Sequence, residues 1–317
     1  MTKDELRDIL RWPFSRKARK RIATRPRPPQ CRRLFMTLVV RDEADTIEKS
    51  IRFHHAMGVD GFVVSSHNSK DATNAILDRL AAEGLVKRLF VRTTPDHRHG
   101  EWVNEMVRCA GEEFGADWVI NADGDEFYYS EALDLKKSIN ACEGANALWI
   151  DSTFLFPDDK PNFFESTYFV TRPLRTFEAE QAGVAGDPAF ADFIESQGCT
   201  KVIHRTSGFL SVTNGNHDVS MMHRIKCHAG GIRLYHYHVR NYAGYEGKVR
   251  RWMDSARLMP EGQCAHLKHM VALYESGQLR EDYDRRYSAA KRQRLIELGV
   301  VAHDPSVRNF MAKEGLL

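Results

Sequence analysis

A short acidic run is the feature of this sequence most suited to chemistry. It reads Asp123-Gly-Asp125-Glu126 and follows the apolar segment 118–120 after Asn121 and Ala122. Three carboxylates within four residues repel one another, so such a turn is costly to form unless a cation lies among them. Hard divalent ions with oxygen ligands, Mg²⁺ or Mn²⁺, suit this group and keep coordination positions open for substrate phosphates. The run predicts a metal site, but at this point a solvated acidic turn explains it equally well.

Two other classes of acidic site do not fit the run. A calcium-binding EF-hand loop starting at Asn121 requires Gly at its sixth position and Glu at its twelfth, where this chain has Glu126 and Ala132. A phosphatase with an aspartyl nucleophile would carry paired aspartates after the first strand of its sheet. The first apolar run here is followed by Arg41-Asp42-Glu43 instead.

Two histidines far along the chain could complete such a site. In the alternating segment 234–238, His236 and His238 lie two residues apart and therefore share one face of a strand. A neutral imidazole is a competent metal ligand. Two histidines on one face, together with the acidic run, favour a functional role over that of a hydrogen-bonded core residue.

Alternating strand and helix patterns surround these residues. Apolar runs predict strands at 34–40, 62–65, 85–91 and 118–120, and helical periodicity predicts helices at 44–57, 71–83 and 101–114. Further strands are expected at 147–154 and 231–239, while 155–200 shows no clear period. This alternation predicts an α/β fold with a mainly parallel sheet flanked by helices. Such sheets bind ligands at the carboxyl ends of their strands, where the acidic run lies.

Charge is distributed unevenly along the 317 residues. Residues 1–33 hold twelve Lys or Arg and three Asp or Glu, whereas the remainder is acidic overall. We therefore expect a basic, Pro-containing tail over 1–32, a catalytic domain over 33–240 and a helical extension packed on it over 241–317. The tail is either solvated or a contact with anionic membrane lipid. Nucleic acid is not expected as a partner, because the body is acidic.

The sequence also predicts where in the cell the protein lies. No apolar run approaches the length of a membrane span. The basic start is not followed by the apolar run of an export signal. We expect a cytoplasmic protein that contacts the inner face of the membrane only peripherally, if at all.

Several motifs together resemble one known family. Asp123-Gly-Asp125-Glu-Phe127 resembles the Asp-x-Asp motif of GT-A glycosyltransferases, close to the family 2 type, which reads Asp-Ala-Asp-Glu-Phe. The resemblance covers roughly residues 33–250. Its other matching segments, in chain order, are Val40-Arg-Asp-Glu43, His55 to Asp60, Ser66 to Thr73, Glu101-Trp102, Lys201-Val-Ile-His-Arg205, Gly215-Asn-His217 and His236-Tyr-His-Val-Arg240 with Tyr245 and Lys248.

This resemblance implies a GT-A-like (Rossmann-like) fold and a set of donor-binding residues. Asp123 and Asp125 would hold the metal that bridges the diphosphate of the donor, with His236 as a third ligand. Glu43 and Asp71 would lie near the nucleotide base and ribose. His67 stands where the family often has Asp, which leaves the identity of the nucleotide open.

The remaining candidate residues are assigned more loosely. Arg240 and Lys248 could bind the diphosphate, and Trp102 could stack on a sugar ring. The resemblance places His217 on the acceptor side or near the metal. A transferase also needs a carboxylate to take the proton of the acceptor hydroxyl. Asp218 is the candidate base, with Asp151 and Glu165 as competitors.

Together these observations predict a metal-dependent, hexosyltransferase-type glycosyltransferase. It would use Mn²⁺ or Mg²⁺ and move a sugar from a nucleotide-diphosphate donor, with a UDP-sugar favoured, to a glycan or another hydroxyl acceptor. One alternative is a metal-dependent nucleotidyltransferase or nucleotide-sugar hydrolase. The other is a non-catalytic protein that binds nucleotide sugars or glycans.

Overall fold

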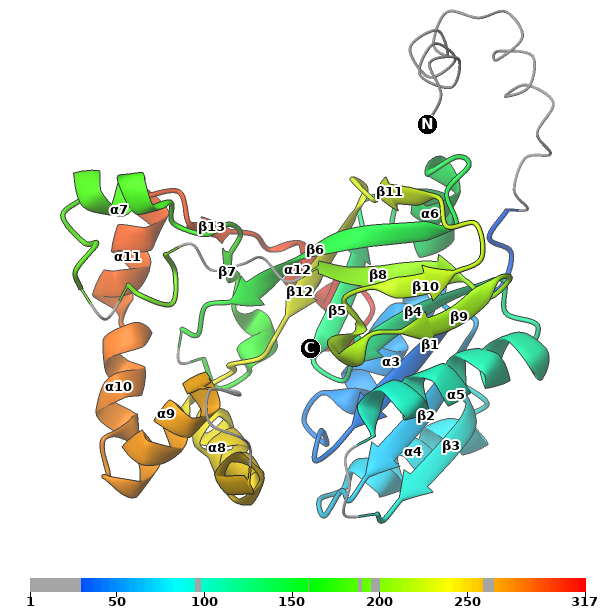
Figure 1. Ribbon diagram of the computed structural model, residues 1–317, viewed down its shortest axis with the longest axis horizontal. Coiled ribbons are helices and arrows are strands. Elements are labelled where there is room, and N and C mark those ends of the chain that lie inside the picture. Colours follow the sequence, from blue (N-terminus) through cyan, green and yellow to red (C-terminus); the bar gives the residue numbers. More distant parts are fainter. Residues whose placement is uncertain (1–29, 95–97, 159, 188–189, 195–199, 259–264) are drawn as a thin grey trace, which may run out of the picture.

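The computed structural model describes residues 30–94, 98–158, 160–187, 190–194, 200–258 and 265–317, so most of the predicted basic tail lies outside the described residues. The first half of the chain alternates between strands and helices as predicted (Figure 1). Its elements are β1 (Leu34–Val40), α3 (Ile47–Ala56), β2 (Gly61–His67), α4 (Thr73–Ala82), β3 (Val86–Arg92), α5 (His99–Glu112) and β4 (Trp118–Asp123).

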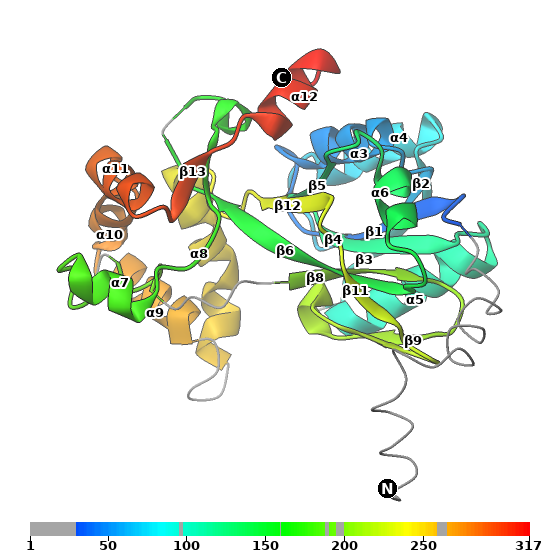
Figure 2. The ribbon, with the colours of Figure 1, turned by 90° about the horizontal axis from the view of Figure 1, so that it is seen from above.

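The alternation of side chains along β1 explains the layers around the sheet. Leu34, Met36 and Leu38 belong to the core that also contains residues of α3 and α4. Phe35 points to the opposite face and joins the core formed with α5. Figure 2 shows α3 and α4 on one side of these strands and α5 on the other. A strand that is buried on both faces needs a continuous apolar run, which is what residues 34–40 supply.

The second half of the chain adds strands that run in both directions. Its elements are β5 (Glu126–Ser130), α6 (Leu135–Ala141), β6 (Ala147–Leu155), η2 (Phe163–Glu165), β7 (Tyr168–Val170), α7 (Thr176–Gln181), β8 (Thr200–Arg205), β9 (Phe209–Val212), η3 (Asn214–Asn216), β10 (Val219–Met221), β11 (Lys226–His228) and β12 (Ile232–His236). The segment that shows no period in the sequence thus contains the short elements η2, β7 and α7.

The large sheet has the strand order β13-β7-β6-β8-β4-β1-β2-β3. Strands β3, β2, β1 and β4 are parallel neighbours, whereas β8 runs antiparallel between β4 and β6. The predicted α/β fold, with a mainly parallel sheet flanked by helices, is confirmed. The antiparallel strand β8 is an addition that the sequence patterns do not predict, and it carries a residue of the site described below.

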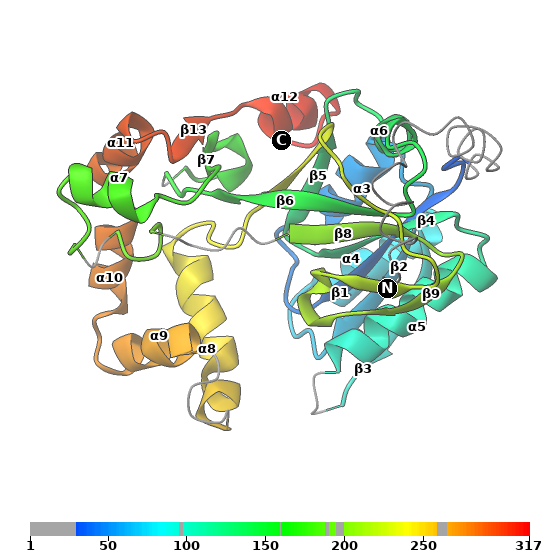
Figure 3. The same ribbon diagram turned by 45° about the horizontal axis from the view of Figure 1, so that its top comes forward.

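The C-terminal region contains the predicted helices and one strand. It comprises α8 (Tyr242–Leu258), α9 (Ala265–Glu275), α10 (Leu279–Arg286), α11 (Ala289–Glu297), β13 (Val301–His303) and α12 (Ser306–Lys313). Helices α8 to α11 form a separate group, but β13 pairs with β7 and α12 packs against β5 (Figure 3). The end of the chain therefore returns to the main sheet. Across the described residues, each helix is too short or too polar to cross a membrane.

A fully buried histidine joins α3 to the strand that follows the acidic run. Nε2 of His54 accepts a hydrogen bond from the backbone N–H of Tyr128 at 2.9 Å, while Nδ1 lies 2.7 Å from the carbonyl oxygen of Ser50. This pattern requires a neutral ring with its proton on Nδ1. Burial lowers the pKa of His54 to about 3.

We expect His54 to make the fold sensitive to acid. Between pH 6.5 and about 3 the unfolded chain binds a proton at this position and the folded chain does not. Stability therefore falls as the pH decreases through this range, by up to about 1.4 kcal/mol per pH unit. In His54→Gln, urea unfolding should show a smaller loss of stability between neutral pH and about pH 4. The exposed neighbour His55, changed to Gln, is the control and should keep the parental slope, whereas an unchanged slope in His54→Gln contradicts this assignment.

Candidate active site

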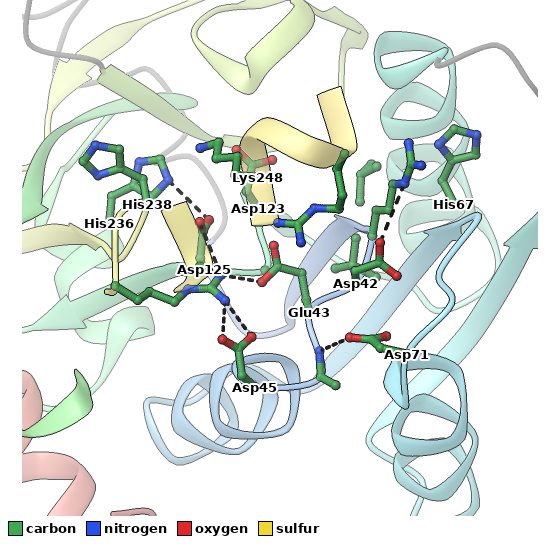
Figure 4. Close-up of a pocket in the computed structure, with 18 of the residues that line it drawn as sticks. Asp42, Glu43, Asp45, His67, Asp71, Asp123, Asp125, His236, His238 and Lys248 are labelled. Atoms are coloured by element: carbon green, nitrogen blue, oxygen red, sulfur yellow. Dashed lines mark hydrogen bonds and ion pairs between the residues drawn. The ribbon is translucent and has the colours of Figure 1, made fainter. Parts of the chain in front are cut away.

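A cavity of about 830 Å³ lies at the sheet edge where β1 and β4 end. The register pairs Val39 of β1 with Asp123 of β4, so the segments that follow both strands meet at this edge. Figure 4 shows the side chains of Glu43, Asp123 and Asp125 close together among the residues that line the cavity. Its charged and histidine lining residues are Arg41, Asp42, Glu43, Asp45, His67, Asp71, His99, Asp123, Asp125, His236, His238, Arg240, Lys248 and Arg251.

The acidic run forms a tight turn between β4 and β5. Asp123 ends β4, Glu126 begins β5, and Oε2 of Glu126 accepts a hydrogen bond from the backbone N–H of Asp123 at 3.0 Å. Gly124 lies against the loop after β1, because a Cβ atom there would be 3.2 Å from side-chain atoms of both Glu43 and Val40. A side chain at this position would require the side chains of Glu43 and Val40 to shift by a few tenths of an ångström.

Strand pairing brings His236 to this turn. Strand β12 pairs antiparallel with β5, and the register places His236 opposite Glu126. Nε2 of His236 lies 3.2 Å from Oδ1 of Asp125. The strand ends at His236, so His238 lies just beyond it and not on it as predicted, but the centres of the two rings are 5.4 Å apart. The structure therefore places Asp123, Asp125 and His236 around one cavity.

Two basic side chains neutralise the carboxylates. Nζ of Lys201, on β8, lies 2.9 Å from Oδ2 of Asp123 and 2.8 Å from Oε1 of Glu126. Arg240 follows β12 and reaches back to the loop after β1, where it pairs with Glu43 and with both carboxylate oxygens of Asp45 (Figure 4). Its Nη2 is also 3.6 Å from Oδ2 of Asp125.

The pKa values of the acidic turn reflect a balance between burial and these cations. Burial by itself raises the pKa of Asp123, but Lys201 and His99 together outweigh it and the pKa lies below its ordinary value. The pKa of Asp125 is lowered in the same way, against burial, by His236 and Arg240. The pKa of Glu126 is raised, because burial outweighs Lys201. Burial also raises the pKa of Glu43 to about 7, although Arg240 opposes it.

Burial rules out the solvated acidic turn. Asp125 is only 9% exposed and Glu126 is completely buried. Carboxylates that serve solubility stay in water, because transfer of an unpaired charge into the interior is very costly. The turn is instead an internal feature whose charges are matched by other parts of the chain.

The side chains at the turn are of the types that a hard divalent cation prefers. Asp123 and Asp125 offer carboxylate oxygens and His236 an imidazole nitrogen, a set that suits Mn²⁺ or Mg²⁺. Within the described part of the chain, no three His, Cys, Asp or Glu side chains stand in positions to ligate one ion together. Lys201 contacts one carboxylate oxygen of Asp123, and Arg240 lies 3.6 Å from Oδ2 of Asp125.

The other predicted donor-side residues also lie at the cavity. Glu43, Asp71, Arg240 and Lys248 all line it. Asp71 fastens the loop after β1, because its carboxylate accepts hydrogen bonds from the backbone N–H groups of Ala44 and Thr73 at 3.1 and 2.9 Å.

The predicted acceptor-side residues do not line this cavity. The carboxylate of Asp218 pairs with Arg224 at 2.9 Å, and Nδ1 of His217 lies 2.8 Å from the carbonyl oxygen of Thr200. Trp102 is buried, with its ring 4.7 Å from that of His67. The roles of these three residues stay predictions.

Sequence reasoning missed several residues of the site. It assigned no role to Asp45, His99, Arg251 or Lys201, although Lys201 begins one of the matching motifs. The sequence offers one signal for Lys201. It directly precedes the apolar pair Val202-Ile203, which is typical of a buried strand, so a charged side chain there would lie within the sheet.

Comparison with known proteins shows which family this chain is similar to. The family model of glycosyltransferase family 92 matches residues 37–272, which is more than half of the chain. Among the curated proteins, no relative matches.

Three solved structures illustrate the likeness to known folds. TarS of S. aureus in complex with UDP-GlcNAc is 13% identical, with 89% of this chain and 80% of that chain covered and a TM-score of 0.38. The mannosyltransferase PcManGT of Pyrobaculum calidifontis, in complex with GDP-Man and Mn²⁺, is 14% identical, with 94% and 89% covered and a TM-score of 0.40. Glucosyl-3-phosphoglycerate synthase of Mycobacterium tuberculosis, in complex with Mn²⁺, UDP and glucosyl-3-phosphoglycerate, is 17% identical, with 55% and 57% covered and a TM-score of 0.30.

We expect Arg240 to hold the cavity together by charge. The Arg240→Met variant leaves Glu43, Asp45 and Asp125 without their shared cation, and should lower the free energy of unfolding by about 3 kcal/mol at pH 8. The loss should shrink at about pH 5, where the carboxylates can take up protons. Urea unfolding at both pH values measures this difference.

Arg250→Met is the matched control, because that side chain is 59% exposed and its pair with Glu246 lies on the surface of α8. It should cost less than about 1 kcal/mol. An equal loss for Arg240→Met at both pH values would show that packing, and not charge, explains the effect.

Proposed function

Because the chain belongs to glycosyltransferase family 92, we propose that it moves a sugar from a nucleotide-diphosphate donor, with a UDP-sugar favoured, to a hydroxyl group of a glycan or another acceptor. The motifs predict the same class of reaction, although they resemble family 2. The observation that carries the proposal is the meeting of Asp123, Asp125 and His236 in one charged cavity at the carboxyl ends of β1 and β4.

The donor would bind with its diphosphate between the acidic turn and α8. Asp123, Asp125 and His236 would hold a divalent cation, Mn²⁺ or Mg²⁺, which neutralises the negative charge that develops on the leaving diphosphate. Lys248 and Arg251 are one helical turn apart on α8, and both line the cavity. Their side chains are donors that suit phosphate oxygens.

The nucleoside would lie at the other end of the cavity. Asp71 fixes the loop that carries Asp42 and Glu43, and the backbone N–H of Glu43 donates to Oγ1 of Thr73 at 2.8 Å. In this proposal the rigid loop presents Glu43 to the base and ribose. A raised pKa for Glu43 allows its carboxyl group to donate a hydrogen bond near neutral pH as well as to accept one.

The general base on the acceptor side is assigned from the sequence. A general base must lie within hydrogen-bond reach of the acceptor hydroxyl, and Asp218, paired with Arg224 outside the cavity lining, stays the sequence-based candidate. Contact of the basic tail with anionic membrane also stays a prediction, because residues 1–29 lie outside the described residues.

We expect UDP to stabilise the protein only weakly alone and strongly with Mn²⁺. A ligand that binds only the folded state raises its stability by about 2.7 kcal/mol at 100 times its dissociation constant. In Asp125→Asn the Mn²⁺-dependent part of the thermal shift should disappear. The melting temperature without ligand should change little, because Arg240 keeps Glu43 and Asp45 as partners. Sugar transfer from UDP-sugars, followed by mass spectrometry, should fall at least about 100-fold.

The control for this variant is Asp284→Asn, an exposed carboxylate on α10 that pairs with Arg280. It should respond to UDP and Mn²⁺ as the parent does. A parental response in Asp125→Asn would contradict the metal site. Donor hydrolysis or pyrophosphate release as the sole activity would overturn glycosyl transfer in favour of a hydrolase or nucleotidyltransferase, and donor binding without any product would favour a binding protein.

A further inference from the structure

Lys201 is a buried ammonium group in the middle of the sheet. It lies on β8, between β6 and β4 in the strand order, and its side chain is only 4% exposed. Burial by itself lowers the pKa of a lysine, but Glu126 and Asp123 raise the pKa of Lys201 above its ordinary value, so the group is charged at neutral pH. A buried charge of this kind persists only when it is paired.

Its two carboxylate partners are held in different ways. Glu126 is fully buried, with Oε1 at Lys201 and Oε2 at the backbone N–H of Asp123. Asp123 is partly exposed to the cavity. Its Oδ2 is bound to Lys201, while its Oδ1 lies 3.8 Å from Nε2 of the cavity-lining residue His99. One oxygen of Asp123 is therefore bound to Lys201, and the other lies on the side of His99, which also interacts with this carboxylate.

The lysine also changes the net charge that an incoming cation meets. Asp123, Asp125 and Glu126 together carry up to three negative charges in four residues. Lys201 contacts two of these carboxylates at distances below 3 Å. At such distances, and with little water between the groups, its charge opposes a second cation at the same carboxylates.

We infer that Lys201 is a positioning residue that holds one oxygen of Asp123 and weakens the binding of a divalent cation at the acidic turn. This inference rests on the metal site of the proposed function. It explains how a turn with this charge forms without a ligand. It also predicts that removal of a lysine tightens metal binding, which a purely structural role would not do.

The test is a titration with Mn²⁺ alone and with Mn²⁺ plus UDP, in which free Mn²⁺ is measured by electron paramagnetic resonance. Lys201→Met and Lys201→Gln both remove the charge, and Gln keeps an amide that can donate to Glu126. Each should bind Mn²⁺ at least about tenfold more tightly than the parent. Glu126→Gln removes a negative charge beside the same lysine and should bind Mn²⁺ more weakly, by a similar factor.

Lys291→Met is the matched control, because Lys291 is also buried but lies on α11, with its ammonium 3.6 Å from the centre of the Phe190 ring. Its Mn²⁺ affinity should equal that of the parent. Circular dichroism shows which variants are folded, and Lys201→Gln decides the question if Lys201→Met does not fold. If the parent binds Mn²⁺ and the Lys201 variants bind it equally or more weakly, this inference is overturned and the proposed function is not. No Mn²⁺ binding by the parent, with or without UDP, overturns the metal site of the proposed function as well.

Discussion

The structure of the site depends on opposite charges that meet inside one edge of the sheet. Lys201 holds the acidic turn from one side, and Arg240 ties it to the loop after β1 from the other. Buried ion pairs add little net stability, because the loss of solvation offsets much of the attraction. Their effect here is on geometry, since each carboxylate is held in one position before any ligand arrives. A site whose dipoles and charges are already oriented spends less energy on reorganisation during a reaction.

The sheet makes these contacts possible through its registers. The parallel pairing of β1 with β4 brings the loop at Glu43 beside the turn at Asp125. The antiparallel pairing of β12 with β5 returns His236 to the same turn, and the loop that follows β12 carries Arg240. Strand β8, inserted antiparallel beside β4, supplies Lys201 from a third direction. A slip of one residue in any of these pairings would turn the relevant side chain to the opposite face.

The predictable part of the fold is the part with long, regular patterns. The run 34–40 is a strand with those bounds, and the helix expected at 71–83 is found at Thr73–Ala82, followed by Gly84 with a φ of 79°. Strands β5, β7 and β8 have three to six residues each, too few for a period to stand out. The site divides in the same way. Asp123 and Asp125 lie two residues apart and were identified from the sequence, as was Arg240 from its motif. Lys201 was not, and the carboxylate partners of Lys201 and Arg240 are set by long-range pairing.

These contacts also change what an acidic motif means. From sequence alone, a turn with three carboxylates either lies in water or surrounds a metal ion. The structure shows a third arrangement, in which the protein supplies counter-charges, Asp125 and Glu126 are buried, and Asp123 is partly exposed to the cavity. What remains open to a ligand is then narrow: one oxygen of Asp123, the Asp125–His236 pair, and the cations of α8 across the cavity. A lone cation meets carboxylates that Lys201 and Arg240 already contact, and a lone diphosphate is repelled by the same carboxylates. A bound cation can pair with the acidic turn while a diphosphate pairs with the basic side chains of α8. The distribution of charge therefore favours a ligand that brings a cation and a diphosphate together.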